Sequence, residues 1–402
     1  MHKKRTLTNT LLEYSNSFKV VLITGARQVG KTTFLKDSST SDRKYVSLDD
    51  LEELLKAKND PNGFLITYKP PVLIDEIQYA PEIFKYIKLL VDKSNDRGQI
   101  WLTGSQQFNM MQGVTESLAG RVVIMNMFGF SVYERFEKGD LQKPFFPTQH
   151  IKSVLKYKSP EETFRIIWQG SFPDVVDKSY KERNGFYDSY VKTYLERDVR
   201  QIINLGDEIS FLTFLKVIAA RTGQELNLND IAKDVGISHN TAKNWLSILQ
   251  ISGLVYLLQP YFRNTTKRLT KTPKLYFMDT GLAAYLAGWT TPESLETGIS
   301  SGAFFETFVI SEIIKSYHHN GLNPNLYYYR DNNKNEIDLL IHQDGKFYPI
   351  EIKKTSTPRE VDVKSFKIFA KIENVAFGTL VCLTDNPKLL NENVFAISVW
   401  DI

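Results

Sequence analysis

Short apolar runs alternate with amphipathic stretches along the first 130 residues of the chain. The apolar runs have the length of buried strands and lie at residues 20–24, 45–48, 72–75, 100–103 and 122–125. Most stretches between them are long enough to hold a helix. This alternation is typical of a parallel sheet covered by helices on both faces, so it predicts an α/β fold for the first part of the chain.

A helical pattern replaces this alternation between about residues 150 and 205. One apolar stripe, with steps of three to five residues, consists of Phe186, Tyr190, Val191, Tyr194, Val199 and Ile202. A small helical unit, a basic loop, and then a helix with further strands follow. We therefore predict four parts: a P-loop domain at 1–135, a helical connector or lid at 136–206, a winged helix at 207–297 and a C-terminal domain at 298–402.

Residues 228–238 predict a helix, a tight turn and the start of a second helix. In this interpretation Asn229 caps the first helix, Gly236 supplies the positive φ of the turn, and Ser238 caps the second helix. The second helix, 239–250, turns Ala242, Trp245, Leu246 and Leu249 inward. Its outward residues, where a recognition helix faces a DNA groove, are His239, Asn240, Lys243 and Asn244. Gly253 ends the helix and a strand follows at 254–258, as in a winged-helix unit.

A basic loop follows that strand. Its cations are Arg263, Lys267, Arg268, Lys271 and Lys274, with no acidic residue among them. Such a loop after a winged helix predicts a wing that contacts DNA phosphates. The alternative is a structural helix–turn–helix in an ATPase lid with a solvated basic loop.

Composition adds exclusions. With 402 residues, 42% hydrophobic and 24% charged, the chain has the balance of an ordinary multidomain soluble protein. The net charge of +4 does not by itself indicate a nucleic-acid partner. The single cysteine, Cys382, excludes an internal disulfide or a cysteine-built zinc site, so any metal should be bound by oxygen. The start of the chain lacks an apolar signal segment, and the most hydrophobic uncharged run, 247–262, is too short to span a bilayer. We expect a cytoplasmic protein without a membrane partner.

A phosphate-binding motif follows the first predicted strand. The segment Gly25, Ala26, Arg27, Gln28, Val29, Gly30, Lys31, Thr32 matches G-x-x-x-x-G-K-[ST], and Thr33 can open a helix after it. The glycines let the backbone N–H groups and the helix N-terminus surround phosphates. Lys31 should reach the β- and γ-phosphates, and the Thr32 hydroxyl should bind Mg²⁺.

Residues 71–76 predict a strand that ends in two carboxylates. Asp75 suits Mg²⁺ binding, either directly or through another ligand of the metal, as in a Walker B strand. Glu76 is placed to polarise the attacking water as a general base. A solvated acidic strand end is the alternative, but it explains less when the strand follows a P-loop.

The predicted strand at 100–103 ends near Ser105 and Gln106, where a sensor of the γ-phosphate or of water would lie. Arg121 could contact a phosphate in the same chain or in a neighbouring subunit, and a surface arginine at a strand start is an equally good interpretation. No N-K-x-D motif for guanine is present, so ATP is preferred to GTP.

Two strands near the C-terminus, 337–341 and 347–353, flank the two-residue turn Asp344-Gly345. If this turn sets the register, residues whose numbers sum to 689 face each other. Asp338 then faces Glu351 and Glu336 faces Lys353, all on one face of the hairpin.

Two opposed carboxylates should repel unless a divalent cation lies between them, and oxygen ligands suit Mg²⁺ or Mn²⁺. Lys353 could then orient a water or stabilise charge on a phosphodiester. The alternative is an edge hairpin in which a Glu336–Lys353 salt bridge offsets the repulsion between Asp338 and Glu351.

These motifs carry resemblances to known families. The nucleotide-binding region resembles AAA+-like prokaryotic ATPases. The arrangement D-x₁₂-E-x-K at Asp338, Glu351 and Lys353 resembles PD-(D/E)XK nucleases, which have the restriction-endonuclease-like fold. That resemblance implies that a helical glutamate completes the metal site, with Glu306 the matching position and Glu312 a second choice. Ile337 replaces the proline of the nuclease motif.

The chain as a whole resembles prokaryotic P-loop ATPases with an AAA+-like domain, a winged helix and a C-terminal restriction-endonuclease-like domain. Segments 194–199 and 273–282 resemble further landmarks of that family, and Ala26 stands where relatives often have proline. The resemblance implies an α/β multidomain fold with a P-loop NTPase parallel sheet, a winged-helix domain and a C-terminal restriction-endonuclease-like α/β domain.

Two functions from different classes follow. The first is an ATP-binding and ATP-hydrolysing protein that acts on DNA, with ATP, Mg²⁺ and a second Mg²⁺ or Mn²⁺ in a nuclease site. The alternative is an ATP-switched regulator that binds DNA or a protein and whose C-terminal domain is a catalytically inactive docking surface. Because Arg121 has two interpretations, assembly into a homo-oligomer stays open.

Overall fold

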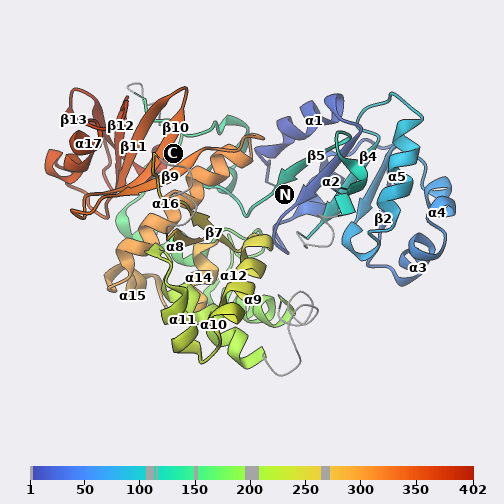
Figure 1. Ribbon diagram of the computed structural model, residues 1–402, viewed down its shortest axis with the longest axis horizontal. Helices are drawn as coiled ribbons and strands as arrows, with labels where there is room; N and C mark the ends of the chain where they lie inside the picture. The colour runs from blue at the N-terminus through green and yellow to red at the C-terminus, as the bar shows by residue number, and fades with distance from the viewer. Residues whose placement is uncertain (1–2, 106–112, 115, 149–152, 195–207, 264–271) are drawn as a thin grey trace.

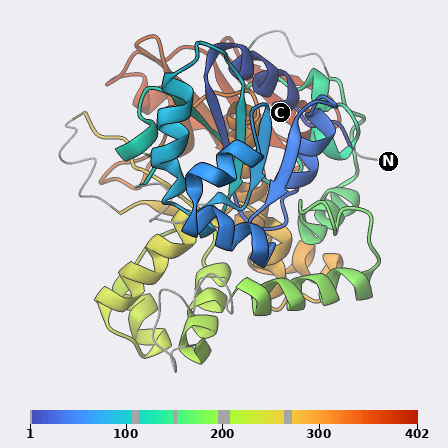
Figure 2. The same cartoon turned by 90° about the vertical axis from the view of Figure 1, so that its right-hand side faces the viewer.

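The computed structural model describes residues 3–402 except for 106–112, 115, 149–152, 195–207 and 264–271. In Figure 1 the blue N-terminal sheet and the orange-red C-terminal sheet lie on opposite sides of the molecule, and the yellow-green helices lie below them. Figure 2 shows the same helices at the lower end of the turned molecule. We call residues 3–135 the N-terminal unit, 208–297 the middle unit and 301–402 the C-terminal unit.

The N-terminal unit contains a parallel sheet with the strand order β2-β3-β4-β1-β5. The strands are β1 (Val20–Thr24), β2 (Lys44–Ser47), β3 (Val72–Asp75), β4 (Ile100–Gly104) and β5 (Val122–Asn126). The helices are α1 (Leu7–Ser17), α2 (Lys31–Ser38), α3 (Leu51–Asn59), α4 (Pro61–Thr67) and α5 (Ile83–Asp92), with a 3₁₀ turn η1 (Ile77–Tyr79). Val20 and Leu22 pack in one core, whereas Val21 and Ile23 pack in another. Because successive strand residues point to opposite faces, both faces of the sheet are covered, and the predicted α/β sheet is confirmed.

A helical connector leads from this sheet to the middle unit. The N-terminal unit ends with α7 (Val132–Arg135), and the elements of the connector are η2 (Gly139–Leu141), α8 (Pro160–Gln169) and α9 (Tyr180–Tyr194). Tyr190, Val191 and Tyr194 are buried along α9, as the predicted stripe requires. Val199 and Ile202 of that stripe lie outside the described residues.

The middle unit combines helices with a three-stranded antiparallel sheet, ordered β6-β8-β7. Its elements are α10 (Glu208–Ala220), β6 (Gln224–Glu225), α11 (Leu228–Val235), α12 (His239–Ile251), β7 (Val255–Leu258), β8 (Lys274–Phe277), α14 (Thr280–Leu286) and α15 (Pro292–Thr297). Gly236, with φ 77°, ends α11, and Ser238 caps α12 by accepting from the N–H of Thr241. The predicted cap Asn229 is wrong. Asn227 caps α11 instead, because its side chain accepts from two N–H groups in the first turn of α11.

The C-terminal unit places a long helix against a mixed six-stranded sheet, ordered β13-β14-β12-β11-β10-β9. Its elements are α16 (Ser301–His318), β9 (Leu326–Arg330), β10 (Glu336–Gln343), β11 (Lys346–Ile352), η4 (Glu360–Val363), α17 (Lys364–Phe369), β12 (Gly378–Cys382), β13 (Lys388–Asn391), β14 (Val394–Ser398) and η5 (Val399–Asp401). Helix α16 contacts β8 of the middle unit as well as β11 of its own sheet. It therefore lies where the units meet.

The β10–β11 hairpin has the predicted register. Gln343 faces Lys346 and Leu339 faces Ile350, so each pair sums to 689. The turn residues Asp344 and Gly345 have φ values of 51° and 70°. Positive φ at both positions is the geometry of a two-residue hairpin turn, which explains how the turn fixes the register.

In the part of the chain described here, no helix is both long enough and apolar enough to cross a membrane.

Candidate functional site: a phosphate-binding loop and a buried charge network

The loop Gly25 to Thr32 connects β1 to α2 and requires glycine at both fixed positions. Gly25 has a φ of +148°, and a Cβ atom there would lie 2.1 Å from the carbonyl oxygen of Met127. Gly30 has a φ of 91° at the N-cap of α2. The loop therefore runs closely over the sheet edge and reaches the N-terminus of α2, where free N–H groups and the helix dipole favour phosphate.

Lys31 is folded over this loop. Its side chain is buried, and its Nζ donates to the carbonyl oxygens of Gly25 at 3.0 Å and Ala26 at 2.8 Å. The ammonium group thus lies at the base of the loop, where the sequence motif places a phosphate-binding cation.

Asp75 collects hydroxyl groups at the end of β3. The Thr32 hydroxyl donates to its two carboxylate oxygens at 2.9 and 3.0 Å, and the Tyr45 hydroxyl donates at 3.1 Å. A third donor is the Thr103 hydroxyl. Burial, and after it the charge of Asp75, raises the pKa of Tyr45 to about 12, which keeps this phenol protonated as a donor. A carboxylate beside the Thr32 hydroxyl offers the hard oxygen ligands that Mg²⁺ prefers.

Glu76 has an unusual backbone conformation. Its φ of 56° lies in the left-handed region, which costs a residue with a side chain about 1–3 kcal/mol. Its N–H donates to the Thr103 hydroxyl at 3.1 Å, and the Gln78 amide donates to its carboxylate. These contacts hold Glu76 beside Asp75 and on the wall of the cavity that Lys31 also lines.

That cavity has a volume of about 910 Å³. The predicted nucleotide-site residues on its wall are Arg27, Gln28, Val29, Gly30, Lys31, Thr32, Thr33 and Glu76. Residues that the sequence motifs did not indicate also line it, among them Lys3, Lys4, Arg5, Phe130, Pro173 and Asp174. The structure thus brings the phosphate loop and Glu76 together and adds a basic N-terminal segment to the same cavity.

Ser105 and Arg121, two of the residues predicted to lie near a phosphate, do not line this cavity. Ser105 is buried, and its hydroxyl has no hydrogen-bond partner among the described residues. Gln106 lies outside the described residues. Arg121 precedes β5, at the sheet edge opposite the phosphate loop, and its guanidinium pairs with Asp92 at 2.6 Å. This position corrects the prediction that Arg121 contacts a phosphate in its own chain, because the length of β5 separates the two. A contact with a neighbouring subunit stays a prediction.

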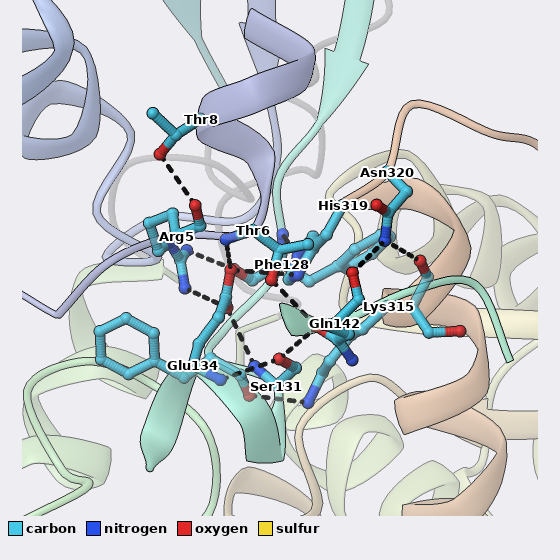
Figure 3. Close-up of polar contacts among 12 residues, drawn as sticks. Arg5, Thr6, Thr8, Phe128, Ser131, Glu134, Gln142, Lys315, His319 and Asn320 are labelled. Carbon is cyan, nitrogen blue, oxygen red and sulfur yellow. Dashed lines mark hydrogen bonds and ion pairs between the residues drawn. The ribbon is translucent and has the colours of Figure 1, made fainter. Parts of the chain in front are cut away.

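A buried ion pair between Arg5 and Glu134 lies beside the phosphate loop (Figure 3). Arg5 NH1 lies 2.9 Å from Glu134, while its NH2 donates to the carbonyl oxygens of Val29 at 2.9 Å and Phe128 at 2.7 Å. Burial opposes the charge of Glu134, but Arg5 and other neighbours lower its pKa below the ordinary value. One guanidinium therefore joins the phosphate loop to the segment after β5.

The same segment is held by α16 of the C-terminal unit. The Glu312 carboxylate accepts from the Val132 N–H at 2.8 Å, and Lys315 Nζ donates to Glu312 at 2.8 Å and to the Phe130 carbonyl at 3.2 Å. His319 Nδ1 lies 3.4 Å from Glu134. We call Arg5, Glu134, Glu312, Lys315 and His319 the Arg5–Glu134 network.

Burial lowers the pKa of His319 to about 4, so this histidine is neutral at pH 7. Sequence motifs missed the Arg5–Glu134 network. The only signal in the sequence is the run of basic residues Lys3, Lys4 and Arg5 at the start of the chain.

The predicted recognition helix presents its polar face to solvent. Ala242, Trp245, Leu246 and Leu249 are buried, as predicted. The exposed residues are His239, Asn240, Lys243 and Asn244. This arrangement leaves the predicted DNA-contacting face of α12 accessible.

The predicted basic loop divides into different environments. Arg263 is exposed but pairs with Glu373 of the C-terminal unit at 2.6 Å. Lys267, Arg268 and Lys271 lie outside the described residues. Lys274 is 4% exposed on β8 and belongs to the protein interior, so its assignment to the basic loop is wrong.

Lys274 lies among the carboxylates of the predicted nuclease site. Its Nζ is 3.1 Å from Glu306, 2.5 Å from Glu336 and 3.8 Å from Asp338. Glu351, on the strand beside β10, pairs with Lys353 at 2.7 Å. We call Glu306, Glu336, Asp338 and Glu351, together with Lys274 and Lys353, the carboxylate cluster.

This geometry corrects the proposed Glu336–Lys353 salt bridge, because Glu336 pairs with Lys274 and Lys353 pairs with Glu351. Of the two helical glutamates, Glu306 lies in the cluster and Glu312 belongs to the Arg5–Glu134 network. Across the described residues, no group of three or more His, Cys, Asp or Glu side chains is arranged to hold a metal ion.

The segment 273–282 has a structural explanation. It forms β8 and the start of α14, with Asp279 as the cap of α14 through a 2.6 Å bond from the Leu282 N–H. Asp279 also accepts from the Ser171 N–H at 2.6 Å and from the Tyr187 hydroxyl at 2.9 Å. A single carboxylate thus ties α14 to the helical connector. The other segment that resembles a landmark of the family, 194–199, lies outside the described residues apart from Tyr194.

Sequence models of known families cover most of the chain. An AAA domain matches residues 17–136, and two domains of unknown function match residues 160–293 (DUF8612) and 301–402 (DUF4143). Among solved structures, a RuvB variant from Thermotoga maritima has 16% sequence identity and a TM-score of 0.30, covering 66% of this chain and 91% of that one. DnaA from Aquifex aeolicus, with AMPPCP bound, has 15% identity and a TM-score of 0.29, covering 61% of this chain and 85% of that one. TM-scores this low do not establish a shared fold.

Two curated mycobacterial proteins are similar over most of their length. The uncharacterized proteins Rv2008c of Mycobacterium tuberculosis and Mb2031c of Mycobacterium bovis are each 30% identical to this chain over 346 residues, which is 84% of this chain and 71% of theirs. The chain is an AAA-domain protein and belongs to the same family as these two mycobacterial proteins.

Proposed function

We propose that this protein binds ATP with Mg²⁺ and hydrolyses ATP at the phosphate loop. The observation that carries the proposal is the direct contact between the Thr32 hydroxyl and the Asp75 carboxylate, beside a loop whose carbonyl oxygens accept from Lys31. The oxygen ligands of Thr32 and Asp75 suit Mg²⁺, and the buried ammonium group of Lys31 suits a bound triphosphate.

Each residue has a distinct role in this proposal. The N–H groups of the loop and Lys31 bind the phosphates, while Thr32 and Asp75 hold the cation. Bound Mg²⁺ would neutralise charge on the β- and γ-phosphate oxygens. Glu76, held by Gln78 and Thr103, orients the attacking water and accepts its proton.

ATP turnover by the purified chain tests this proposal. Lys31→Ala should lose ATP binding, whereas Glu76→Gln should retain binding and lose about 10²–10⁴-fold in turnover, the usual contribution of a general base. Glu82→Gln is the matched control, since Glu82 is an exposed carboxylate that does not line the cavity. Turnover that survives in Glu76→Gln would refute the role of Glu76, and turnover that survives in Lys31→Ala would refute the site.

We further propose that the nucleotide state reaches the C-terminal unit through the Arg5–Glu134 network. Arg5 contacts the carbonyl oxygen of Val29 in the phosphate loop, and Glu134, its partner, lies beside His319. A change in the loop on nucleotide binding would therefore move groups that α16 contacts. This supports an ATP-switched protein, in which turnover resets a conformation.

The exposed face of α12 supports a DNA partner. Lys243 projects from α12 near the exposed residues His239, Asn240 and Asn244. Lys243→Ala should weaken DNA binding and lower the dependence of log K on log salt by about 0.9 for each lost phosphate contact. Lys216→Ala is the control, because Lys216 is an exposed lysine on α10 of the same unit. Fluorescence anisotropy with labelled duplex measures both, and equal effects of the two variants would refute recognition by α12.

For the C-terminal unit we favour a docking role over DNA cleavage. The carboxylate cluster contains the predicted nuclease residues Glu306, Asp338 and Glu351, but Lys274 lies among them. DNA incubated with the protein and Mn²⁺ should stay intact. Cleavage that disappears in Asp338→Ala and Glu351→Ala would establish the nuclease instead.

A further inference from the structure

The carboxylate cluster is assembled from two units of the chain. Lys274 lies on β8 of the middle unit, whereas Glu306 is on α16 and Glu336 and Asp338 are two residues apart on β10. Because residues two apart on a strand share a face, Glu336 and Asp338 both point towards the ammonium group of Lys274. The lysine is thus inserted into the C-terminal unit from its neighbour.

Lys274 has the contacts of a buried, charged lysine. Its side chain is 5% exposed, and its ammonium group lies 5.5 Å from the centre of the Tyr328 ring. Burial opposes the charge, but Glu306, Asp338 and Glu336 raise the pKa of Lys274 above its ordinary value. The ammonium is therefore positively charged and surrounded by oxygen atoms.

The cluster still has more carboxylates than cations. Its four carboxyl groups share the two ammonium groups of Lys274 and Lys353. One further cation, Arg330, lies at the edge of the cluster, 3.8 Å from Glu336. Glu351 is 6% exposed, and its Oε2 has no hydrogen-bond partner within the described chain. An unpaired buried carboxylate oxygen indicates a place that favours a cation.

We propose that the ammonium group of Lys274 is an intramolecular cation that occupies the carboxylate cluster in place of a divalent metal ion. Lys274 and a metal ion then compete for the same carboxylates. Metal binding at the cluster requires Lys274, and with it β8 of the middle unit, to withdraw. Exchange of the Lys274 ammonium group for a metal ion would consequently break the contact between the middle and C-terminal units at the carboxylate cluster.

The competition follows from the geometry. A metal ion between Glu306 and Asp338 would lie within a few ångströms of the Lys274 ammonium, which contacts the first at 3.1 Å and the second at 3.8 Å. Two cations that close repel, and the ammonium contributes no ligand atom, because it has three donors and no acceptor. The proposal does not rest on ATP hydrolysis.

Binding of Mn²⁺ to the nucleotide-free, full-length chain tests the proposal, with electron paramagnetic resonance as the readout. Lys274→Met removes the ammonium and keeps an apolar side chain of similar length. We expect it to bind one Mn²⁺ at least about tenfold more tightly than the wild type, which is about 1.4 kcal/mol. Adding Asp338→Asn to Lys274→Met should abolish that binding, which assigns the ion to the cluster rather than to Asp75.

Two further variants keep the test decisive. Lys274→Met with Glu336→Gln preserves the net charge and should bind Mn²⁺ through Glu306, Asp338 and Glu351 even if the single variant folds poorly. Arg263→Met is the matched control, because Arg263 also joins the middle and C-terminal units through an ion pair, with Glu373. Its Mn²⁺ affinity should equal that of the wild type.

The proposal is overturned if the variants that lack Lys274 bind Mn²⁺ no more tightly than the wild type. It is also overturned if Arg263→Met raises the Mn²⁺ affinity as much as Lys274→Met does. That result would assign the effect to loosening of the interface between the units and not to the ammonium group.

Discussion

The buried pair of Arg5 and Glu134 makes a quantitative prediction about stability. The Arg5 side chain is 6% exposed and the Glu134 side chain is fully buried, at 0%. Glu134→Gln keeps the shape of the side chain but leaves a guanidinium buried without its counter-ion. Removing one partner of a buried pair costs about 3–5 kcal/mol. We therefore expect the free energy of unfolding of the N-terminal unit to fall by about this amount.

Urea unfolding measures the loss, with hydrogen exchange at residues 128–134 to assign it to this part of the chain. Arg5→Met combined with Glu134→Gln should recover part of the stability, because the double variant leaves no unpaired buried charge. Asp92→Asn is the matched control. It breaks an arginine–carboxylate pair with Arg121 whose side chains are 39% and 31% exposed, and exposed pairs contribute little. Equal urea midpoints for Glu134→Gln and Asp92→Asn would refute the reasoning.

Three further predictions concern other groups. Burial lowers the pKa of His319 from 6.5 to about 4, so the folded protein resists protonation of this histidine. The free energy of unfolding should therefore be highest above pH 6.5 and fall by about 3 kcal/mol towards pH 4. In urea titrations, His319→Gln should make this loss smaller. Asp279→Ala removes the cap of α14 and leaves the Leu282 N–H unpaired, so urea unfolding should show a loss of at least about 2 kcal/mol. Asp75→Asn should raise the Mg²⁺ concentration that half-saturates ATP turnover, since Thr32 would keep only a neutral partner; an unchanged Mg²⁺ dependence would exclude Asp75 as a ligand.

The sequence alone was sufficient where local geometry determines the outcome. The phosphate loop follows from fixed glycines, because Gly25 and Gly30 adopt backbone angles that other residues resist. The hairpin register follows from its two-residue turn, since Asp344 and Gly345 fix which residues face each other.

Long-range partners could not be derived in this way. Arg5 and Glu134 are 129 positions apart, and nothing in the spacing of either residue indicates the other. Lys274 was assigned to a basic loop predicted to contact DNA phosphates because its neighbours in sequence are basic, whereas burial on β8 brings it to Glu306 and Glu336. The pattern of apolar and polar residues along the chain predicts which face of a helix or strand a residue lies on. It does not predict which residue of another helix or strand that residue contacts.

The most direct test of the account is hydrogen exchange along α16 with and without ATP. In Glu76→Gln, which should hold ATP without cleaving it, ATP and Mg²⁺ should change the protection of residues 128–134 and of the last turns of α16, near Lys315 and His319. Lys31→Ala should show no change. If Glu76→Gln binds ATP and α16 exchanges as it does without nucleotide, the nucleotide state does not reach the C-terminal unit, and the ATP-switch proposal is contradicted.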